Sequence, residues 1–227
     1  MQKTLKVAVL RFPGTNCEFD TQYAFEKLGH TTKLVWHEDE NLPAEIDLVV
    51  VPGGFSYGDY LRSGSIARFS PVMKAVQKYA NDGGKVLGIC NGFQILAEAG
   101  LLPGALKRNN NLHFISKHQN LCVINNDNAF LSKCEKGEVL NIPIAHADGN
   151  YYIDDKGLKT LEENGQILLR YSDKNGEPVV VNGSVTSIAG ICNKAKNVFG
   201  LMPHPERALE AILGSEDGIR MLKGFET

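Results

Sequence analysis

The chain has 227 residues, of which 43% are hydrophobic, and this length and composition suit one fairly large globular domain with a substantial core. Its formal net charge of −2 provides no overall attraction to nucleic acid or to an anionic membrane. No apolar run approaches the ~20 residues that span a bilayer, and the first residues lack the pattern of a signal peptide. We therefore expect neither nucleic acid nor a membrane as a partner.

The five cysteines bear on the cellular compartment. Their number is odd, and no two of them have C-x-x-C spacing. In a chain of this length, that pattern argues against a disulfide framework and predicts a reducing, cytoplasmic environment. Each cysteine is by default a small buried side chain, so a chemical role for any of them has to follow from its surroundings.

Strands and helices alternate in the first half. Residues 6–10, 46–54 and 85–89 are short runs rich in Val, Leu and Ile with Gly or Pro close by, which is typical of buried parallel strands. Residues 33–38 are predicted to form a further strand. Helical patterns lie between these strands, over the segments 20–29 and 70–84. The first predicted helix has Tyr23 on its apolar face, and the second begins with a Ser-Pro pair that is typical of a helix start.

This alternation predicts an α/β fold. Crossovers between parallel strands are right-handed, so we expect an open, mostly parallel sheet with helices on both faces. The ligand site of such a sheet lies at the carboxyl ends of its strands. In this chain, the loops at those ends begin at Arg11, Pro52 and Cys90.

The second half of the chain has a different pattern. Asn and Asp are frequent over residues 107–171 and apolar runs are shorter, which predicts mixed or antiparallel strands that close one edge of the sheet. The dipeptide Asn182-Gly183 predicts a hairpin turn. A final strand, a loop with two prolines and a helix over residues 208–213 complete the chain. No linker or repeat is seen, so we expect one domain over residues 1–227.

The sequence GICNG places Cys90 between two glycines, where a strand is expected to turn into a helix. The same arrangement with serine is the nucleophile elbow of another enzyme class, in which a sharp, strained turn requires small neighbours. The following helix directs its N-terminus at the cysteine, and its free N–H groups favour the thiolate. A buried cysteine that simply packs the turn is the alternative explanation.

A thiolate nucleophile needs a base, and the base needs a group that orients it. The segment MPHPER supplies a candidate pair in His204 and Glu206. Residues two apart in an extended segment point to the same side, and Pro205 is expected to keep this segment non-helical. Glu206 would then hold one imidazole nitrogen and leave the other facing Cys90. Alone, the motif also fits a surface loop with an acid that caps a helix.

Acyl chemistry further requires hydrogen-bond donors for the oxyanion that develops on the substrate carbonyl. Asn91 follows Cys90 at the expected helix start, so its backbone N–H is one candidate. Gly53 and Gly54 end a central strand, and glycines there let the backbone turn a second N–H toward a bound carbonyl. A plain tight turn is the alternative for this pair. Together, these motifs form a Cys-His-Glu constellation at one sheet edge.

This set of motifs resembles the class I (triad) glutamine amidotransferases, in which the P-G-G loop, the cysteine elbow and the H-P-E segment occur in the same chain order. The likeness is closest to the glutaminase subunits of phosphoribosylformylglycinamidine synthase, a family of purine biosynthesis. It is carried by PGGFSYGDYLRSGSIARFS, GICNGFQIL, GLLPGAL, AHADGNYY and GLMPHPER. These segments cover most of the chain, and CNGFQ is typical of this branch.

The resemblance implies roles for the matching residues. Cys90 would attack the carboxamide of L-glutamine to form a γ-glutamyl thioester, His204 would transfer protons, and Glu206 would orient His204. Backbone N–H groups near Gly54 and at Asn91 would hold the oxyanion.

Two further residues match positions beside the glutamine site of this family. Gln94 matches a position that contacts glutamine. His146 begins a loop next to the glutamine site, and either a contact or a purely structural role is consistent with its position.

The resemblance also implies partners. In this family, ammonia released from glutamine converts formylglycinamide ribonucleotide to the amidine, and ATP with Mg is consumed. This chain has no G-x-x-x-x-G-K-[S/T] loop and is too short to hold a synthase domain as well. ATP and the ribonucleotide are therefore expected on a separate synthase subunit, with a small bridging subunit and no cofactor bound by this chain. Ammonia would travel between the sites through protein.

Two alternatives remain open from the sequence. One is a glutaminase subunit of another amidotransferase, or a stand-alone cysteine hydrolase on the same fold. The other is a glutamine-sensing or interaction module with a dead site, which the presence of Cys90, His204 and Glu206 argues against.

Several other features are assigned no chemistry. No metal site is expected, because the spacings of the other histidines and of Glu38 fit no common site. Cys17, in the loop after the first strand, is expected to pack. Residues 108–111, with the sequence RNNN, are expected to form a solvated turn. Residues 57–69 fit a surface loop and helix, a partner interface or an exit for ammonia.

Overall fold

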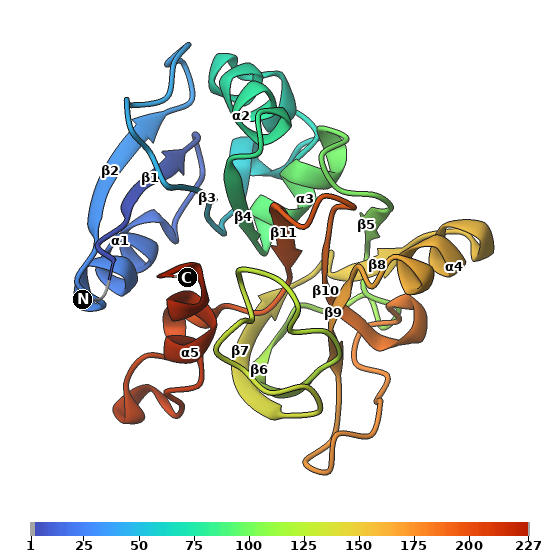
Figure 1. The fold of residues 1–227 in the computed structure, drawn as a ribbon. Helices are drawn as coiled ribbons and strands as arrows, with labels where there is room; N and C mark the ends of the chain where they lie inside the picture. The colour runs from blue at the N-terminus through green and yellow to red at the C-terminus, as the bar shows by residue number, and fades with distance from the viewer. Residues whose placement is uncertain (1–2, 227) are drawn as a thin grey trace.

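The computed structural model describes residues 3–226, and its centre is a nine-stranded sheet (Figure 1). Five neighbouring strands run parallel; in sheet order they are β2 (Thr31–Trp36), β1 (Lys6–Arg11), β3 (Leu48–Val51), β4 (Lys85–Ile89) and β11 (Val198–Leu201). The sheet continues with antiparallel neighbours; these are β10 (Ile188–Cys192), β9 (Ile167–Tyr171), β6 (Ile115–Val123) and β7 (Val139–His146). The predicted α/β fold, parallel in its first half and antiparallel along one edge, is confirmed.

Helices flank this sheet. They are α1 (Glu18–Lys27), α2 (Pro71–Asn81), α3 (Asn91–Glu98), α4 (Asp155–Glu163) and α5 (Gly218–Lys223). The helix α1 packs on β1 and β2, whereas α3 packs on β3, β4 and β11. A separate ribbon pairs β5 (Ala105–Lys107) with β8 (Asn150–Tyr152). Within residues 3–226, no helix is both long and apolar enough to cross a membrane.

The burial of α1 differs from the prediction. The inward face of this helix carries Thr21, Ala24 and Phe25, whereas Tyr23 is 51% exposed. Tyrosine tolerates this position because its hydroxyl donates to Glu210 Oε1 at 2.5 Å on the protein surface. Phe25, which has no polar group to satisfy, takes the core position instead.

Two predicted elements are wrong. The segment around Asn182 forms no hairpin, because the Asn182 side chain turns inward and donates to the carbonyl oxygen of Gly149 at 2.7 Å. No α-helix forms over residues 208–213, where the structure has a 3-10 turn at Ala211–Leu213. Gly214 ends this turn with a left-handed φ of 96°, and the last helix begins only at Gly218.

The parallel strands fix the position of the loops that matter. Since β1, β3, β4 and β11 are adjacent and parallel, their carboxyl ends lie along one edge of the sheet. The loops that leave this edge contain Cys17, Gly53, Cys90 and His204. Residues from four distant parts of the sequence therefore meet where ligand sites of open α/β sheets lie.

Candidate active site

The backbone of Cys90 is strained at the junction of β4 and α3. Its φ of 51° and ψ of −106° are rare for a residue with a Cβ and cost about 1–3 kcal/mol. The flanking glycines permit this turn through close backbone contacts. A Cβ on Gly92 would lie 1.8 Å from the carbonyl oxygen of Val51, and a Cβ on Gly88 would lie 2.7 Å from the Gly92 carbonyl oxygen. The two glycines thus have the close-packing role that the motif predicts.

The Cys90 thiol is nearly enclosed. It is 6% exposed and lies at the N-terminal end of α3, where the first backbone N–H groups of a helix have no partner within the helix. The Cys90 N–H donates to the carbonyl oxygen of Leu201 at 2.8 Å, which ties the elbow to β11. The sulfur lies 3.6 Å from the carbonyl oxygen of Ala145, near the end of β7.

His204 and Glu206 form a buried pair at the end of β11. The Nδ1 atom of His204 lies 2.6 Å from Glu206 Oε1, and both side chains are almost fully enclosed. The connection differs from the predicted extended segment, because Pro205 begins a 3-10 turn over Pro205–Arg207. Proline suits the first position of such a turn, since its fixed φ is helical. The turn folds Glu206 back onto the imidazole.

The remaining groups around His204 leave one nitrogen available. Its backbone N–H donates to the carbonyl oxygen of Pro143 in β7 at 2.8 Å. Its Nε2 atom is buried and has no hydrogen-bond partner among the described residues. Burial lowers the pKa of His204, but the charges of Glu206 and Cys90 outweigh burial and leave this pKa well above its ordinary value. The site therefore favours a proton on the imidazole beside the thiol.

Gly53 lies between the thiol and the imidazole. A Cβ on this residue would lie 2.8 Å from His204 Cε1 and 3.4 Å from Cys90 Cβ. Gly54 lies one residue farther along, where a Cβ would be 2.7 Å from the backbone nitrogen of Asn16. Of the two glycines, Gly53 is the one in direct contact with the groups that sequence motifs single out.

Cys17 belongs to this site, which corrects the prediction that it only packs. Its thiol is buried and would lie 3.0 Å from a Cβ on Gly53. Arg207 Nη2 donates to the Cys17 sulfur at 3.1 Å. The signal in the sequence was the position of Cys17 after β1, at the same edge as the other loops.

The site does not suit a metal ion. Ligand atoms of Cys17, His204 and Glu206 lie within 4.8 Å of one another. However, the Arg207 guanidinium occupies the side of the Cys17 sulfur where a cation would add further positive charge, and Glu206 already holds His204. We therefore assign the three side chains no metal.

Asn91 and Gln94 connect two loops to the start of α3. Asn91 Oδ1 accepts from the backbone N–H of Ser56 at 3.1 Å, and its Nδ2 donates to Gln94 Oε1 at 2.9 Å. Gln94 Nε2 in turn donates to the carbonyl oxygen of Asp148 at 2.8 Å. Both side chains are buried, so they hold the loops after β3 and β7 against the elbow.

His146 lies at the end of β7, with 3% of its surface exposed. Its Nδ1 atom lies 3.2 Å from the side-chain oxygen of Asn109. Asn109 belongs to the RNNN segment and is fully buried, so the prediction of a solvated turn is wrong at this residue. Asparagine patterns indicate turns in general, and they do not reveal that one member is drawn into the interior by hydrogen bonds.

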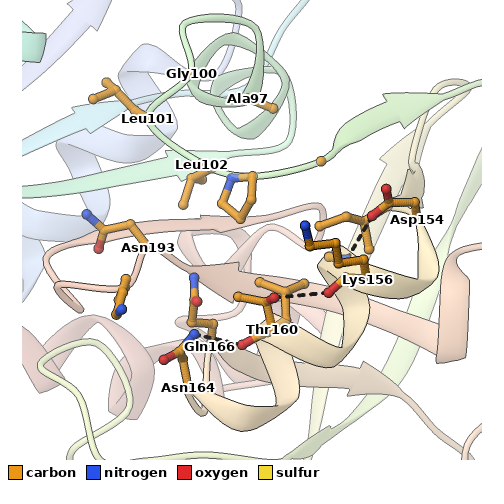
Figure 2. Close-up of a pocket in the computed structure, with 16 residues that line it drawn as sticks. Ala97, Gly100, Leu101, Leu102, Asp154, Lys156, Thr160, Asn164, Gln166 and Asn193 are labelled. Atoms are coloured by element: carbon orange, nitrogen blue, oxygen red, sulfur yellow. Dashed lines mark hydrogen bonds between the residues drawn. The ribbon is translucent and has the colours of Figure 1, made fainter.

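A separate cavity of about 750 Å³ lies at the other end of α3, between the segment 100–104 and α4 (Figure 2). Its lining begins at Ala97 on α3, whereas Cys90 precedes the first residue of that helix. Polar groups of the lining are already bonded within the protein: Gln166 Nε2 donates to Cys192 O at 2.9 Å, and Thr160 Oγ1 donates to Lys156 O at 3.0 Å. We therefore assign the chemistry to the Cys90 edge and not to this cavity.

The chain was compared with known proteins. A model of the CobB/CobQ-like glutamine amidotransferase domain matches residues 4–217. This chain belongs to the glutamine amidotransferase family. The phosphoribosylformylglycinamidine synthase subunit PurQ of Sulfurimonas denitrificans is 69% identical over 221 residues, which cover 97% of this chain and 99% of that protein. The PurQ subunit of Wolinella succinogenes is 66% identical with the same coverage.

A solved structure is similar over the whole fold. The structure of PurLQS from Thermotoga maritima contains a chain that matches this glutamine amidotransferase with a TM-score of 0.88 and 42% identity, covering 98% of both chains. These comparisons confirm the family that the motifs indicate and place the chain among the PurQ glutaminase subunits. The chain is thus an enzyme subunit of the glutamine amidotransferase class.

Proposed function

We propose that this glutamine amidotransferase hydrolyses L-glutamine through Cys90, His204 and Glu206 and delivers the ammonia to a separate synthase subunit. That subunit would convert formylglycinamide ribonucleotide and ATP to formylglycinamidine ribonucleotide in purine biosynthesis. One observation carries the proposal: the buried His204–Glu206 pair, 2.6 Å apart, lies at the same sheet edge as a thiol at a helix N-terminus.

The first half of the reaction makes the thioester. The Cys90 thiolate attacks the carboxamide carbon of glutamine, and the carbonyl electrons move to oxygen. Backbone N–H groups at Asn91 and at Gly53 or Gly54 are placed to stabilise that oxyanion. As the carbonyl reforms, the C–N bond breaks while the His204 imidazolium protonates the departing nitrogen, so neutral ammonia leaves.

The second half regenerates the enzyme. His204, now neutral, takes a proton from water, and the hydroxyl attacks the thioester carbon. The C–S bond breaks, glutamate leaves and the thiolate returns with a protonated His204. Glu206 holds Nδ1–H throughout, which keeps Nε2 directed at the reacting atoms.

The proposed partners follow from the relatives. Two PurQ subunits match over almost the whole chain, and the similar solved structure is described as PurLQS. The chain also has no P-loop sequence for ATP. We assign ATP, Mg and the ribonucleotide to the synthase subunit, expect a small bridging subunit, and place the complex in the cytoplasm.

The synthase is proposed to dock on the segment 55–69. This segment begins at the Gly53–Gly54 turn and contacts the elbow through the Ser56–Asn91 hydrogen bond. Its large apolar side chains are exposed: Tyr60 by 75%, Leu61 by 90% and Phe69 by 71%. Apolar and aromatic side chains of this kind, grouped beside a reactive site, are typical of an interface core.

The test combines the chain with candidate synthase and bridging subunits, ATP, Mg and formylglycinamide ribonucleotide. Glutamate and amidine are measured with glutamine or with an ammonium salt as the nitrogen source. We expect Cys90→Ala to abolish glutamine-dependent synthesis and to leave ammonium-dependent synthesis unchanged, and Cys122→Ala to behave like the wild type. Glutamine-dependent activity of Cys90→Ala would contradict the mechanism. Glutamine hydrolysis without activation by any synthase would instead favour a stand-alone hydrolase.

A further inference from the structure

Asn109 determines which nitrogen of His146 carries the proton. Asn109 Nδ2 donates to the carbonyl oxygens of His113 and His146, both at 2.9 Å. Asn109 Oδ1 accepts from the backbone N–H of Gly149 at 3.1 Å. These three bonds leave no freedom to exchange the amide oxygen and nitrogen. Because His146 Nδ1 faces the oxygen at 3.2 Å, Nδ1 must be the protonated nitrogen.

The other nitrogen, Nε2, is therefore a bare lone pair. It is buried and has no hydrogen-bond partner among residues 3–226. A buried acceptor without a donor costs about 1–3 kcal/mol, so an arrangement that creates one calls for a donor that arrives from outside the chain. The donor must be a ligand, because the surrounding protein groups are already fixed.

The surroundings of His146 belong to the proposed active site. The preceding carbonyl oxygen, of Ala145, lies 3.6 Å from the Cys90 sulfur, and the carbonyl oxygen of Asp148 accepts from Gln94. The His204 charge also acts on His146: burial and this charge lower the pKa of His146 to about 4, although the Asp148 charge opposes the change. The His146 imidazole is thus neutral at physiological pH, close to a charged His204.

We propose that His146 Nε2 accepts a hydrogen bond from the carboxamide nitrogen of glutamine and then from the ammonia that this nitrogen becomes. The inference rests on the function proposed above. A lone pair cannot stabilise the oxyanion or the substrate carboxylate, which are acceptors themselves. The carboxamide nitrogen carries N–H groups in every state of the reaction, and it is the atom that His204 must protonate.

The chemistry of this acceptor suits ammonia. His204 supplies the proton that completes the leaving group, and His146 only accepts an N–H hydrogen bond without a transfer of its own. Since the neutral His146 has no proton on Nε2 to give, it cannot convert ammonia to ammonium. The nitrogen would leave the site as the neutral nucleophile that the synthase reaction requires.

Two substitutions separate this role from a structural one. His146→Gln can place an amide oxygen near the position of Nε2, whereas His146→Asn can retain the contact with Asn109 but does not reach that position. If Nε2 is the acceptor, the Gln variant keeps kcat for glutamate release within about 3-fold, and the Asn variant loses about 30-fold in kcat with little change in KM. If His146 only supports Asn109, the order is reversed. That reversal, or equal losses in two folded variants, would overturn the inference.

A measurement on the unaltered protein makes the test independent of variant folding. Long-range ¹H–¹⁵N correlation spectra distinguish protonated from unprotonated imidazole nitrogens. We expect His146 Nε2 to appear unprotonated at pH 7, and a protonated Nε2 would overturn the inference directly. A wild-type complex that releases no glutamate would overturn the proposed function itself, and this inference with it.

Discussion

Gly53 and His204 approach so closely that a Cβ on Gly53 would lie 2.8 Å from the imidazole Cε1. The same Cβ would lie 3.0 Å from the Cys17 sulfur and 3.4 Å from Cys90 Cβ. The backbone at residue 53 therefore sets the space between the thiol and the imidazole. Even a methyl group there must displace one of the three side chains, so the glycine is required by contact and not only by its turn.

Replacement of Gly53 by alanine is expected to damage chemistry more than stability. A displacement of about 1 Å at a reacting group can cost about 100-fold in rate, and we expect a loss of this size in kcat for glutamate release from Gly53→Ala. The matched control is Gly137→Ala, where a Cβ meets open space but φ is 85°. The control should lose about 1 kcal/mol of stability and keep its activity. Equal activities of the two variants, measured beside thermal unfolding, would contradict the role of Gly53.

The reactivity of the cysteines should not follow their exposure. Cys90 is nearly buried, whereas Cys122 is partly exposed and burial raises the pKa of its thiol. Because Cys90 lies at a helix N-terminus beside His204, iodoacetamide at pH 6.5 should modify Cys90 about 10-fold faster than Cys122. Peptide mass spectrometry gives both rates. His204→Asn should abolish the preference, and labelling in order of exposure would contradict the assignment of Cys90 as a thiolate.

The sequence was most informative where the chemistry is local. The elbow needs only a strand, two glycines and a helix start around Cys90, and all of these are neighbours in the chain. The approach of His204 and Glu206 was predictable from the order of parallel strands, because their carboxyl ends must share one edge. The 3-10 turn at Pro205 was missed, since the same proline suits both an extended segment and the first position of a turn.

Features that depend on long-range side-chain contacts were not predictable. Asn182 looks like a hairpin residue, but its amide is used by the carbonyl oxygen of Gly149, and the strand pairing is lost. Asn109 looks like a turn residue, and its burial follows only from its bonds to the segment 146–149. The place of Cys17 in the site depends on Arg207, which is 190 residues away in the sequence.

The burial of His146 should appear in the pH dependence of stability. Its pKa is about 4 in the folded protein and near 6.5 when unfolded, so the unfolded state binds the proton more readily. Its contribution is present above pH 6.5 and is lost as the pH falls toward 4. Over this range, we expect wild-type stability to fall by roughly 3 kcal/mol more than that of His146→Gln. His204 does not interfere, because its raised pKa gives a contribution that is complete below pH 6.5.

Urea unfolding at several pH values between 4 and 7 measures this difference. His118→Gln, which changes an exposed histidine, is the matched control and should give a curve parallel to the wild type. Parallel curves for His146→Gln as well would show that His146 is not held neutral by its surroundings.

Asp59 should have the opposite effect on stability. Burial raises the pKa of Asp59 to about 6, and Asp148 adds to the rise, against a hydrogen bond from Ser63 that lowers it. The folded state therefore binds the proton more readily, so a penalty for the charged form is absent below pH 3.8 and complete above pH 6. Asp59→Asn removes the charge and should stabilise the protein by about 1–2 kcal/mol at pH 8, a value reduced because the group is partly exposed. No gain is expected at pH 3.5.

The control for this prediction is an aspartate in a favourable place. Asp155 lies in the first turn of α4, where a negative charge is stabilised by the helix dipole. Asp155→Asn should lower stability at pH 8 by about 0.3–1 kcal/mol, so the two substitutions have opposite signs. Unfolding free energies at pH 3.5 and pH 8 decide the matter. A loss of stability on Asp59→Asn at pH 8 would mean that hydrogen bonds to the carboxylate outweigh its burial and its repulsion by Asp148.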